Sequence, residues 1–459
     1  MAANEWNDAL EEQIGRWRNY LRRRQAIHGV DVEELEDHLR DQVAALVDGG
    51  LSGDEAFLVA VKRVGDLDEL SREFAREYSE RLWKQLVVSS EDADKEGGAG
   101  RREFLVAVGL AIAAALAIKV PALFGIGFDG DASASFYGRN LSLFALPFLA
   151  GYFAWKRRLS AALWRWLPLP FVVGAVFANV FPFVIDGGAT QVLTALHLPI
   201  ALWLAVGFAY AGGDWRNHSR RMDFVRFSGE WFIYYVLIAL GGGVFMLFTM
   251  LLFSAIGLDA ERLLENWVVP CGAMGAVIIA GWLVEAKQSV VENMAPVLTR
   301  LFTPLFAVLL LGFLGTMAVT GSGLDVEREL LIGFDLLLVL VLGLLLYALS
   351  ARDPRAPAGG FDVLQLVLVV AALVVDALAL LAIAARISEF GFSANKVAAL
   401  GENIILLANL GWSSWLYWRF VRGRGTFTAL ERWQTVYIPV YLVWAWLVVL
   451  LFPPLFDYA

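Results

Sequence analysis

The sequence predicts an all-α protein: a polytopic transmembrane helical bundle of about 11 spans, preceded by a small N-terminal cytoplasmic four-helix domain. Composition is the first reason, because 58% of the 459 residues are hydrophobic and only 18% are charged. Soluble domains are roughly half apolar and a quarter charged. The second reason is that apolar runs recur from Phe104 onward between short charged loops. Their length matches the roughly 20 residues that a helix needs to cross a bilayer.

Eleven such runs can be placed along the chain. The second run is short, so we expect it to extend into its flanks. The cores of the predicted spans are residues 104–124, 141–155, 167–185, 191–211, 231–256, 267–284, 301–319, 331–349, 363–385, 400–418 and 435–452.

The charges between these spans predict their orientation. Short cytoplasmic loops of membrane proteins are enriched in Lys and Arg. With the N-terminus inside, the inner loops that follow the first span carry 16 Lys and Arg residues, and the outer loops carry five. Adding or removing one span would scramble this alternation. We therefore expect eleven spans with the C-terminus outside.

The N-terminal region has its own pattern. Residues 1–98 hold 13 Lys and Arg against 23 Asp and Glu, whereas the rest of the chain is nearly neutral. Residues 1–88 predict an acidic domain with amphipathic helices over 4–26, 31–48, a stretch opening at Ser52 and 68–84. Ser52 and Glu55 form a capping-box pattern at the third helix. Residues 89–101 predict a flexible linker, and residues 102–459 the transmembrane domain. The first 100 residues contain no apolar signal segment, so we expect this domain in the cytoplasm.

Residues 32–74 carry a resemblance to a known family. The segment VEELEDHLRDQVAALVDGGLSGDEAFLVAVKRVGDLDELSREF resembles the permease-prefix (HAAS-type) domain of bacterial membrane proteins. The resemblance implies a protein partner for residues 1–88. The alternative is a solvated bundle that only aids folding. The acidic charge argues against nucleic acid as a partner.

Polar side chains within the late spans form the candidate intramembrane site. Ionisable groups at membrane depth are rare and expensive, so each is a functional hypothesis. Glu402, Asn409 and Ser413 share one helix face by their spacing. Asp376 and Asn409 lie at matched depths, as do Asp335 and Asn403, which predicts two hydrogen-bonded layers. The candidate residues are Asp335, Asp376, Arg386, Glu389, Glu402, Asn403 and Asn409.

Two interpretations of this site stay open. One is a proton or ion relay, or a polar substrate cavity open to the outside. The other is purely structural: interhelical hydrogen bonds, with Asp376 protonated or paired to Asn409.

A second resemblance covers the late helices. The segments ENMAPVLTRLFTPLF and ARISEFGFSANKVAALGENIILLANL look like an uncharacterised family of bacterial polytopic membrane proteins. That likeness implies the bacterial cytoplasmic membrane and gives no catalytic residue. The matching residues of the loop are Arg386, Ile387, Glu389, Phe390, Gly391, Ser393 and Asn395.

No enzyme, cofactor or metal motif is present, and Cys271 is the single cysteine. We expect His197, within an apolar span, to be hydrogen-bonded inside the bundle rather than to act as a ligand. Three functions remain: a regulatory or accessory membrane protein, a secondary transporter using Asp335 and Asp376, and a membrane-embedded enzyme. The transporter gains support from the expectation that three consecutive glycines, 241–243, break the fifth span.

Overall fold

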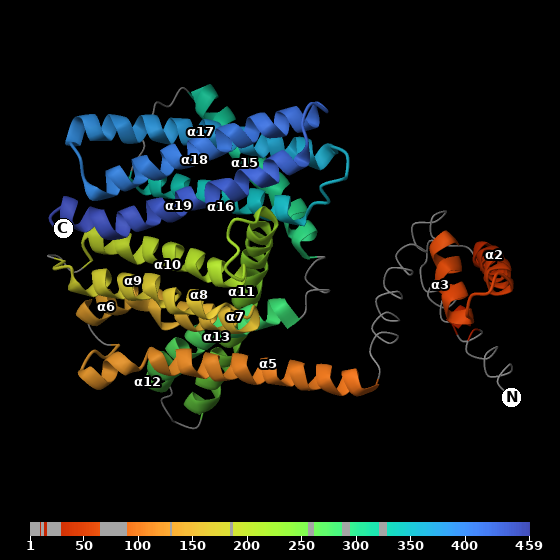
Figure 1. The fold of residues 1–459 in the computed structure, drawn as a ribbon. Coiled ribbons are helices and arrows are strands. Elements are labelled where there is room, and N and C mark those ends of the chain that lie inside the picture. The colour runs from red at the N-terminus through yellow and green to blue at the C-terminus, as the bar shows by residue number, and fades with distance from the viewer. Residues whose placement is uncertain are drawn as a thin grey trace. The chain divides into compact units, whose positions relative to one another are not determined.

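In the computed structural model the chain forms two compact units, Met1–Arg102 and Glu103–Ala459. The structure describes residues 10, 13–15, 29–64, 90–128, 131–183, 187–255, 261–286, 294–320 and 328–459. Within these ranges the secondary structure is helical and contains no strand (Figure 1). The predicted all-α class is therefore confirmed for the described part of the chain.

The N-terminal unit contains α2 (Gly29–Asp48) and α3 (Gly53–Val64), separated by a turn at Gly49 and Gly50. Leu39 and Val43 of α2 pack against Phe57 and Val61 of α3, and all four side chains are almost fully buried. The pairing follows from the apolar stripe that each helix carries. The expected helix over 68–84 and most of the one over 4–26 lie outside the described residues.

The start of α3 has the predicted cap. The carboxylate of Glu55 accepts hydrogen bonds from the backbone N–H of Ser52 at 3.0 Å and from its hydroxyl at 2.7 Å. The first of these bonds satisfies the backbone N–H of Ser52, a donor that has no partner within the helix. The two bonds also hold the pKa of Glu55 below its ordinary value.

The segment predicted to be a linker differs from the prediction. Helix α5 runs from Ser90 to Ala117, so residues 90–101 are helical rather than an irregular linker. Once the apolar part of α5 has formed, each further residue adds a hydrogen bond without a new nucleus. The Asp, Glu, Lys and Ala residues that precede it can therefore join the same helix.

The second unit is a bundle of long helices. After α5 the chain forms the short helices α6 (Asp131–Asn140), α7 (Leu146–Lys156), α8 (Ala161–Trp166) and α9 (Pro168–Val180). The middle of the unit consists of α10 (Ala189–Tyr210), α11 (His218–Ala255), α12 (Glu261–Leu263) and α13 (Val269–Ala286). The last helices are α15 (Met294–Thr320), α16 (Arg328–Ala351), α17 (Gly360–Phe390), α18 (Ala394–Val421) and α19 (Phe427–Leu455).

Nine helical stretches within the described residues are long and apolar enough to cross a membrane. They correspond to nine of the eleven predicted spans. The two others, 141–155 and 400–418, are helical but do not qualify. The first is interrupted by a tight helical turn at Leu141–Phe144, and the second lies in α18, which carries charged and amide side chains. A multi-pass membrane protein is thus the architecture that the helices support.

Helix α11 corrects one expectation. It continues without a break through Gly241, Gly242 and Gly243, so these glycines do not interrupt the span. In a bilayer a broken helix would leave backbone groups unsatisfied, and this keeps glycine-containing segments helical. The second half of α11 exposes large apolar side chains such as Phe245 and Leu252, as a lipid-facing helix does.

Two apolar cores hold the unit together. One joins α5, α7, α9, α10, α11 and α13, and the other joins α15 to α19. Helices α17, α18 and α19 run beside one another, and α19 also packs along α10 (Figure 1). The contact between α18 and α19 is close at Gly401, where a Cβ atom would lie 2.0 Å from the Trp444 ring. This glycine lets α18 bring the next residue, Glu402, toward α10.

Candidate functional site

Asp335 and Asn403 form the first polar contact of the late helices. The Asn403 amide on α18 donates a hydrogen bond to Asp335 Oδ1 on α16, at 2.8 Å. Its second amide hydrogen goes to the Ala399 carbonyl, also at 2.8 Å. The predicted Asp335–Asn403 layer is therefore present.

The predicted pairing of Asp376 with Asn409 is wrong. Asn409 turns toward α19, where its amide donates to Gln434 Oε1 at 3.0 Å and to the Tyr441 hydroxyl at 2.6 Å. Its carbonyl accepts from Trp433 Nε1 at 2.7 Å. Ser413 joins the same group by accepting from Gln434 at 2.7 Å. The Asn409 side chain is thus fully hydrogen-bonded, which is the pattern of a structural contact.

Asp376 differs from Asn409 in its hydrogen bonding. Its side chain on α17 is completely buried, and neither carboxylate oxygen has a hydrogen-bond partner among the described residues. The effective penalty for burying an unpaired ion is several kcal/mol. The structure therefore accommodates Asp376 only when a proton or a bound cation neutralises it. Asp335 is close enough for its charge to act on Asp376, and two adjacent negative charges add to the penalty.

A third unpartnered oxygen belongs to Asn403. Because both of its amide hydrogens point at acceptors, the orientation of the side chain is fixed, and Oδ1 is the oxygen left over. This oxygen is buried and has no donor within the described part of the chain. Unpartnered buried polar groups are uncommon and require an explanation.

His197 and Glu402 form a second polar pair in the same region. His197 Nε2 on α10 lies 2.6 Å from Glu402 Oε1 on α18, and His197 Nδ1 lies 2.8 Å from the Leu193 carbonyl. The expectation that His197 is hydrogen-bonded inside the bundle is confirmed. Its partner was not predicted, although both residues stand eight positions after the first residue of their helices, Ala189 and Ala394. This equal depth is the signal that could have paired them.

Arg386 and Glu389 lie away from this group. They stand ten and thirteen residues after Asp376 on α17, which corresponds to about 15–20 Å along the helix axis. Glu389 is exposed and Arg386 is half-buried. The structure does not bring either of them to Asp376.

No family model matches this chain, and neither a curated protein nor a solved structure matches it. The function therefore has to be inferred from the residues themselves.

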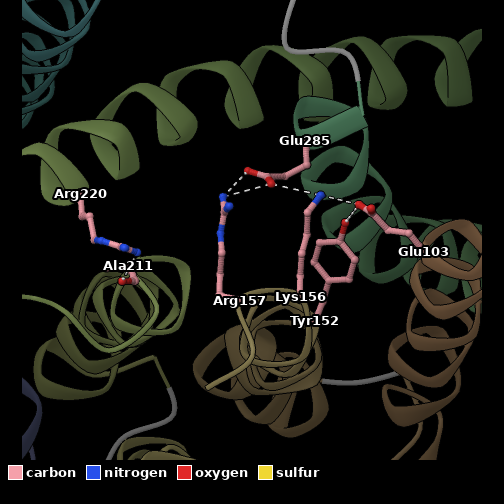
Figure 2. Close-up of polar contacts among 7 residues, drawn as sticks. All are labelled: Glu103, Tyr152, Lys156, Arg157, Ala211, Arg220 and Glu285. Atoms are coloured by element: carbon pink, nitrogen blue, oxygen red, sulfur yellow. Dashed lines mark hydrogen bonds and ion pairs between the residues drawn. The ribbon is translucent and has the colours of Figure 1, made fainter. Parts of the chain in front are cut away.

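A network of four charged residues, which was not predicted, joins α5 to the C-terminal ends of α7 and α13 (Figure 2). Glu285 on α13 contacts Arg157 at 2.9 and 3.0 Å and Lys156 at 3.1 Å. Lys156 also bonds Glu103 on α5, which accepts from the Tyr152 hydroxyl at 2.6 Å. Two acids and two bases balance, and each carboxylate has a cationic partner. The network therefore ties α5, α7 and α13 together without a spare charge.

The residues give no sign of a multi-ligand metal centre. Across the described ranges, no group of three or more His, Cys, Asp or Glu side chains is placed to hold a metal ion. Asp376 instead offers two buried carboxylate oxygens that have no hydrogen-bond partner among the described residues. Oxygen ligands of this kind suit a proton or a hard cation rather than a transition metal.

Proposed function

We propose that this chain is a secondary transporter of the bacterial cytoplasmic membrane that exchanges a small monovalent cation for a proton at Asp376. The observation that carries the proposal is the complete burial of Asp376 without any hydrogen-bond partner in the described structure. Intramembrane acids that face the bundle interior mark ion pathways and proton relays. Because a proton and a cation neutralise the same carboxylate, only one of them binds at a time. That competition is the simplest way to couple their movements.

Asn409 provides the contrast that supports this function. A carboxylate that only joined helices would have partners, as Asn409 has on α19. Asp376 has none among the residues that the structure describes. A role in joining helices by hydrogen bonds therefore does not explain Asp376, whereas ligand binding does.

Interhelical contacts support eleven spans, including the two segments that are less apolar. Asn140, at the start of the short segment, exchanges hydrogen bonds with Asn179 at 2.9 and 2.7 Å. Lys156, at its end, bonds Glu103 on α5. The predicted topology assigns the first contact to the outer side and the second to the inner side. We propose that this segment, which joins the two predicted sides, crosses the membrane.

Helix α18 supports the same conclusion. Near its beginning Glu402 meets His197, on the predicted outer half of α10. Near its end Phe420 lies 4.8 Å from the guanidinium of Arg352, in a predicted inner loop. We propose the N-terminus inside, eleven spans and the C-terminus outside.

Everted membrane vesicles test the transport. Respiration acidifies the lumen of such vesicles, and a ΔpH-sensitive acridine dye reports the gradient. Addition of Na⁺, K⁺ or Li⁺ in turn should dissipate the gradient in vesicles with the wild-type protein. Asp376→Asn should abolish the response at equal protein level, and Glu389→Gln, an exposed acid of the same helix, should keep it. Equal responses of wild type and Asp376→Asn to all three cations would contradict the proposal.

A regulatory or accessory role for the N-terminal unit is a second candidate. The observation that favours it is a separate core in Met1–Arg102, built from Leu39, Val43, Phe57 and Val61. We propose that this unit binds a protein partner, as its resemblance to permease-prefix domains implies. Crosslinking of the full-length protein in cells tests this: a specific partner that is lost when residues 1–88 are deleted would support the role. Unchanged crosslinks after the deletion would exclude it.

A further inference from the structure

The hydrogen bonds of His197 determine where its protons are. A backbone carbonyl can only accept, so the nitrogen that faces the Leu193 carbonyl, Nδ1, carries a hydrogen. Nε2 faces Glu402 Oε1 at 2.6 Å. If Nε2 were bare and Glu402 ionised, two lone pairs would face each other and repel.

One proton therefore lies between Nε2 and Oε1. It is bound either to the ring, as imidazolium beside carboxylate, or to Glu402, as carboxylic acid beside neutral imidazole. Both forms leave the pair with no net charge, which the buried location of the ring favours. Loss of that proton would leave the pair with one negative charge and without its hydrogen bond. The contact between α10 and α18 is thus proton-dependent.

The surroundings of the pair are mostly apolar. One turn away, Leu193 packs with Ala398 of α18 and with Val448 and Phe452 of α19. Helix α9 and residues 442–455 of α19 contain no ionisable side chain. The other parts of α10, α18 and the helices packed against them do carry ionisable groups. These are Asp131, Tyr137 and Arg139 of α6; Tyr152 and Lys156 of α7; Tyr210 of α10; His218, Arg220, Arg221, Asp223, Arg226, Glu230, Tyr234 and Tyr235 of α11; Arg328, Glu329, Asp335 and Tyr347 of α16; Asp362, Asp376, Arg386 and Glu389 of α17; Lys396, Tyr417 and Arg419 of α18; and Glu431, Arg432, Tyr437 and Tyr441 of α19.

Helix α18 connects the pair to Asp335. Glu402 bonds α10, and the next residue, Asn403, bonds Asp335 on α16. Consecutive residues of one helix turn therefore join α18 to two different helices. A shift of α18 that separates Glu402 from His197 would also move Asn403 relative to Asp335 and Asp376.

We propose that His197 and Glu402 form a second proton-binding site, which holds one proton while α10 and α18 are joined and releases it when they separate. This inference rests on the proposed function, because it assigns the pair to the same exchange cycle. In the release step, Glu402 gives its proton to water, the O–H bond breaks, and the pair changes from neutral to one negative charge. In the reverse step, a hydronium ion returns the proton.

Nitrogen NMR of the histidines tests the site directly. The full-length protein is labelled with ¹⁵N-histidine and placed in lipid bilayers, and the His197 signals are assigned by their loss in His197→Gln. The chain has only four histidines. We expect Nδ1 to be protonated throughout and Nε2 to change from proton-bearing to bare as the pH rises. Glu402→Gln should alter this pH dependence, and His218→Gln, a histidine of α11, should leave it unchanged.

Two NMR results would overturn the inference. One is a bare Nε2 at every pH, which would mean that no proton is shared. The other is a His197 pH dependence in Glu402→Gln that is identical to that of the wild type.

The vesicle assay adds a functional readout. Glutamine at 197 can still hydrogen-bond Glu402 but cannot carry the proton, so His197→Gln should melt like wild type and yet lose cation–proton exchange. We expect a loss of about 100-fold, the lower end of what a positioned proton-transfer group contributes. The double variant with Glu402→Gln should be no slower than either single variant, because the two residues act as a unit.

The two proposals fail in different ways. If His197→Gln exchanges normally while Asp376→Asn is inactive, the second proton site is wrong and the transport function stands. If no exchange is seen in the wild type but His197 titrates as described, the transport function fails and the proton-binding pair remains.

Discussion

Replacing Asp376 with leucine should stabilise the protein while removing its function. The wild-type side chain is fully buried and unpartnered. A buried polar group without a partner costs about 1–3 kcal/mol, and leucine removes this cost. Asn409→Leu is the matched control, because asparagine has nearly the same size as aspartate and is also fully buried. Any strain from the larger leucine should be similar at the two positions.

The control should change stability in the opposite direction. Asn409→Leu removes four hydrogen bonds, to Gln434, Tyr441, Trp433 and Ser413. At about 0.6 kcal/mol for an interhelical bond in a membrane, the loss is about 2 kcal/mol. The free energies of unfolding of the two variants should therefore differ by at least about 3 kcal/mol. Unfolding by SDS in mixed micelles, followed by circular dichroism, measures this difference.

One result would refute the reasoning. If Asp376→Leu lowers the free energy of unfolding as much as Asn409→Leu does, Asp376 forms stabilising contacts. It would then be a structural residue, and the proposal of a neutralising proton or cation would lose its basis.

Three further predictions concern topology, the charged network and the N-terminal unit. In a Cys271→Ser background, an impermeant thiol reagent should label Phe392→Cys from outside intact cells and Arg424→Cys only after permeabilisation. Glu285→Gln should reduce the free energy of unfolding by about 1–3 kcal/mol, because it removes the charged partner that two half-buried cations share. Residues 1–88 alone should melt cooperatively, with a stability that falls as the pH drops through the lowered pKa of Glu55. The lowered pKa gives this sign: the stabilisation is complete above the ordinary value of 4.5 and is lost in more acidic solution.

Each of these predictions has a contrary outcome. Labelling of Arg424→Cys in intact cells would invert or disrupt the eleven-span topology. A Glu285→Gln protein as stable as the wild type would show that the network is not important for folding. A fragment with no cooperative transition would argue against an independent domain. If the stability of a Glu55→Gln fragment falls in acid as much as that of the unsubstituted fragment, the cap does not contribute to the pH dependence.

The apolar pattern predicted most of the membrane helices, because spanning length and hydropathy are properties of the sequence alone. Segments with mixed composition were harder to assign as membrane spans. Helix α18 carries Glu402, Asn403 and Asn409, whose hydrogen-bond partners lie on other helices and cannot be identified from the sequence of α18 alone. The glycines at 241–243 and the linker at 90–101 were predicted to be irregular, yet both are helical. In each case the helix extends through residues with weak local preference because the adjoining turns are already formed.

Within the site, depth was predictable but direction was not. A rise of about 1.5 Å per residue placed Asp335 level with Asn403, and they are bonded. The same reasoning placed Asp376 level with Asn409, but these two side chains are not hydrogen-bonded to each other. Asn409 shares a face of α18 with Glu402, whereas Asn403 lies about 100° around the helix from Glu402. The Glu402 face meets α10 and α19, so Asn409 finds partners on α19. Which neighbour lies on which face depends on the packing of distant helices.

Carbodiimide labelling of Asp376 tests the central claim most directly. Dicyclohexylcarbodiimide dissolves in membranes and modifies protonated carboxyl groups, and mass spectrometry of the digested protein identifies the modified residue. We predict a label on Asp376 in the wild-type protein in bilayers, with a rate that falls when the pH is raised or when the transported cation is added. An unlabelled Asp376, or a label whose rate responds to neither proton nor cation concentration, would contradict the account.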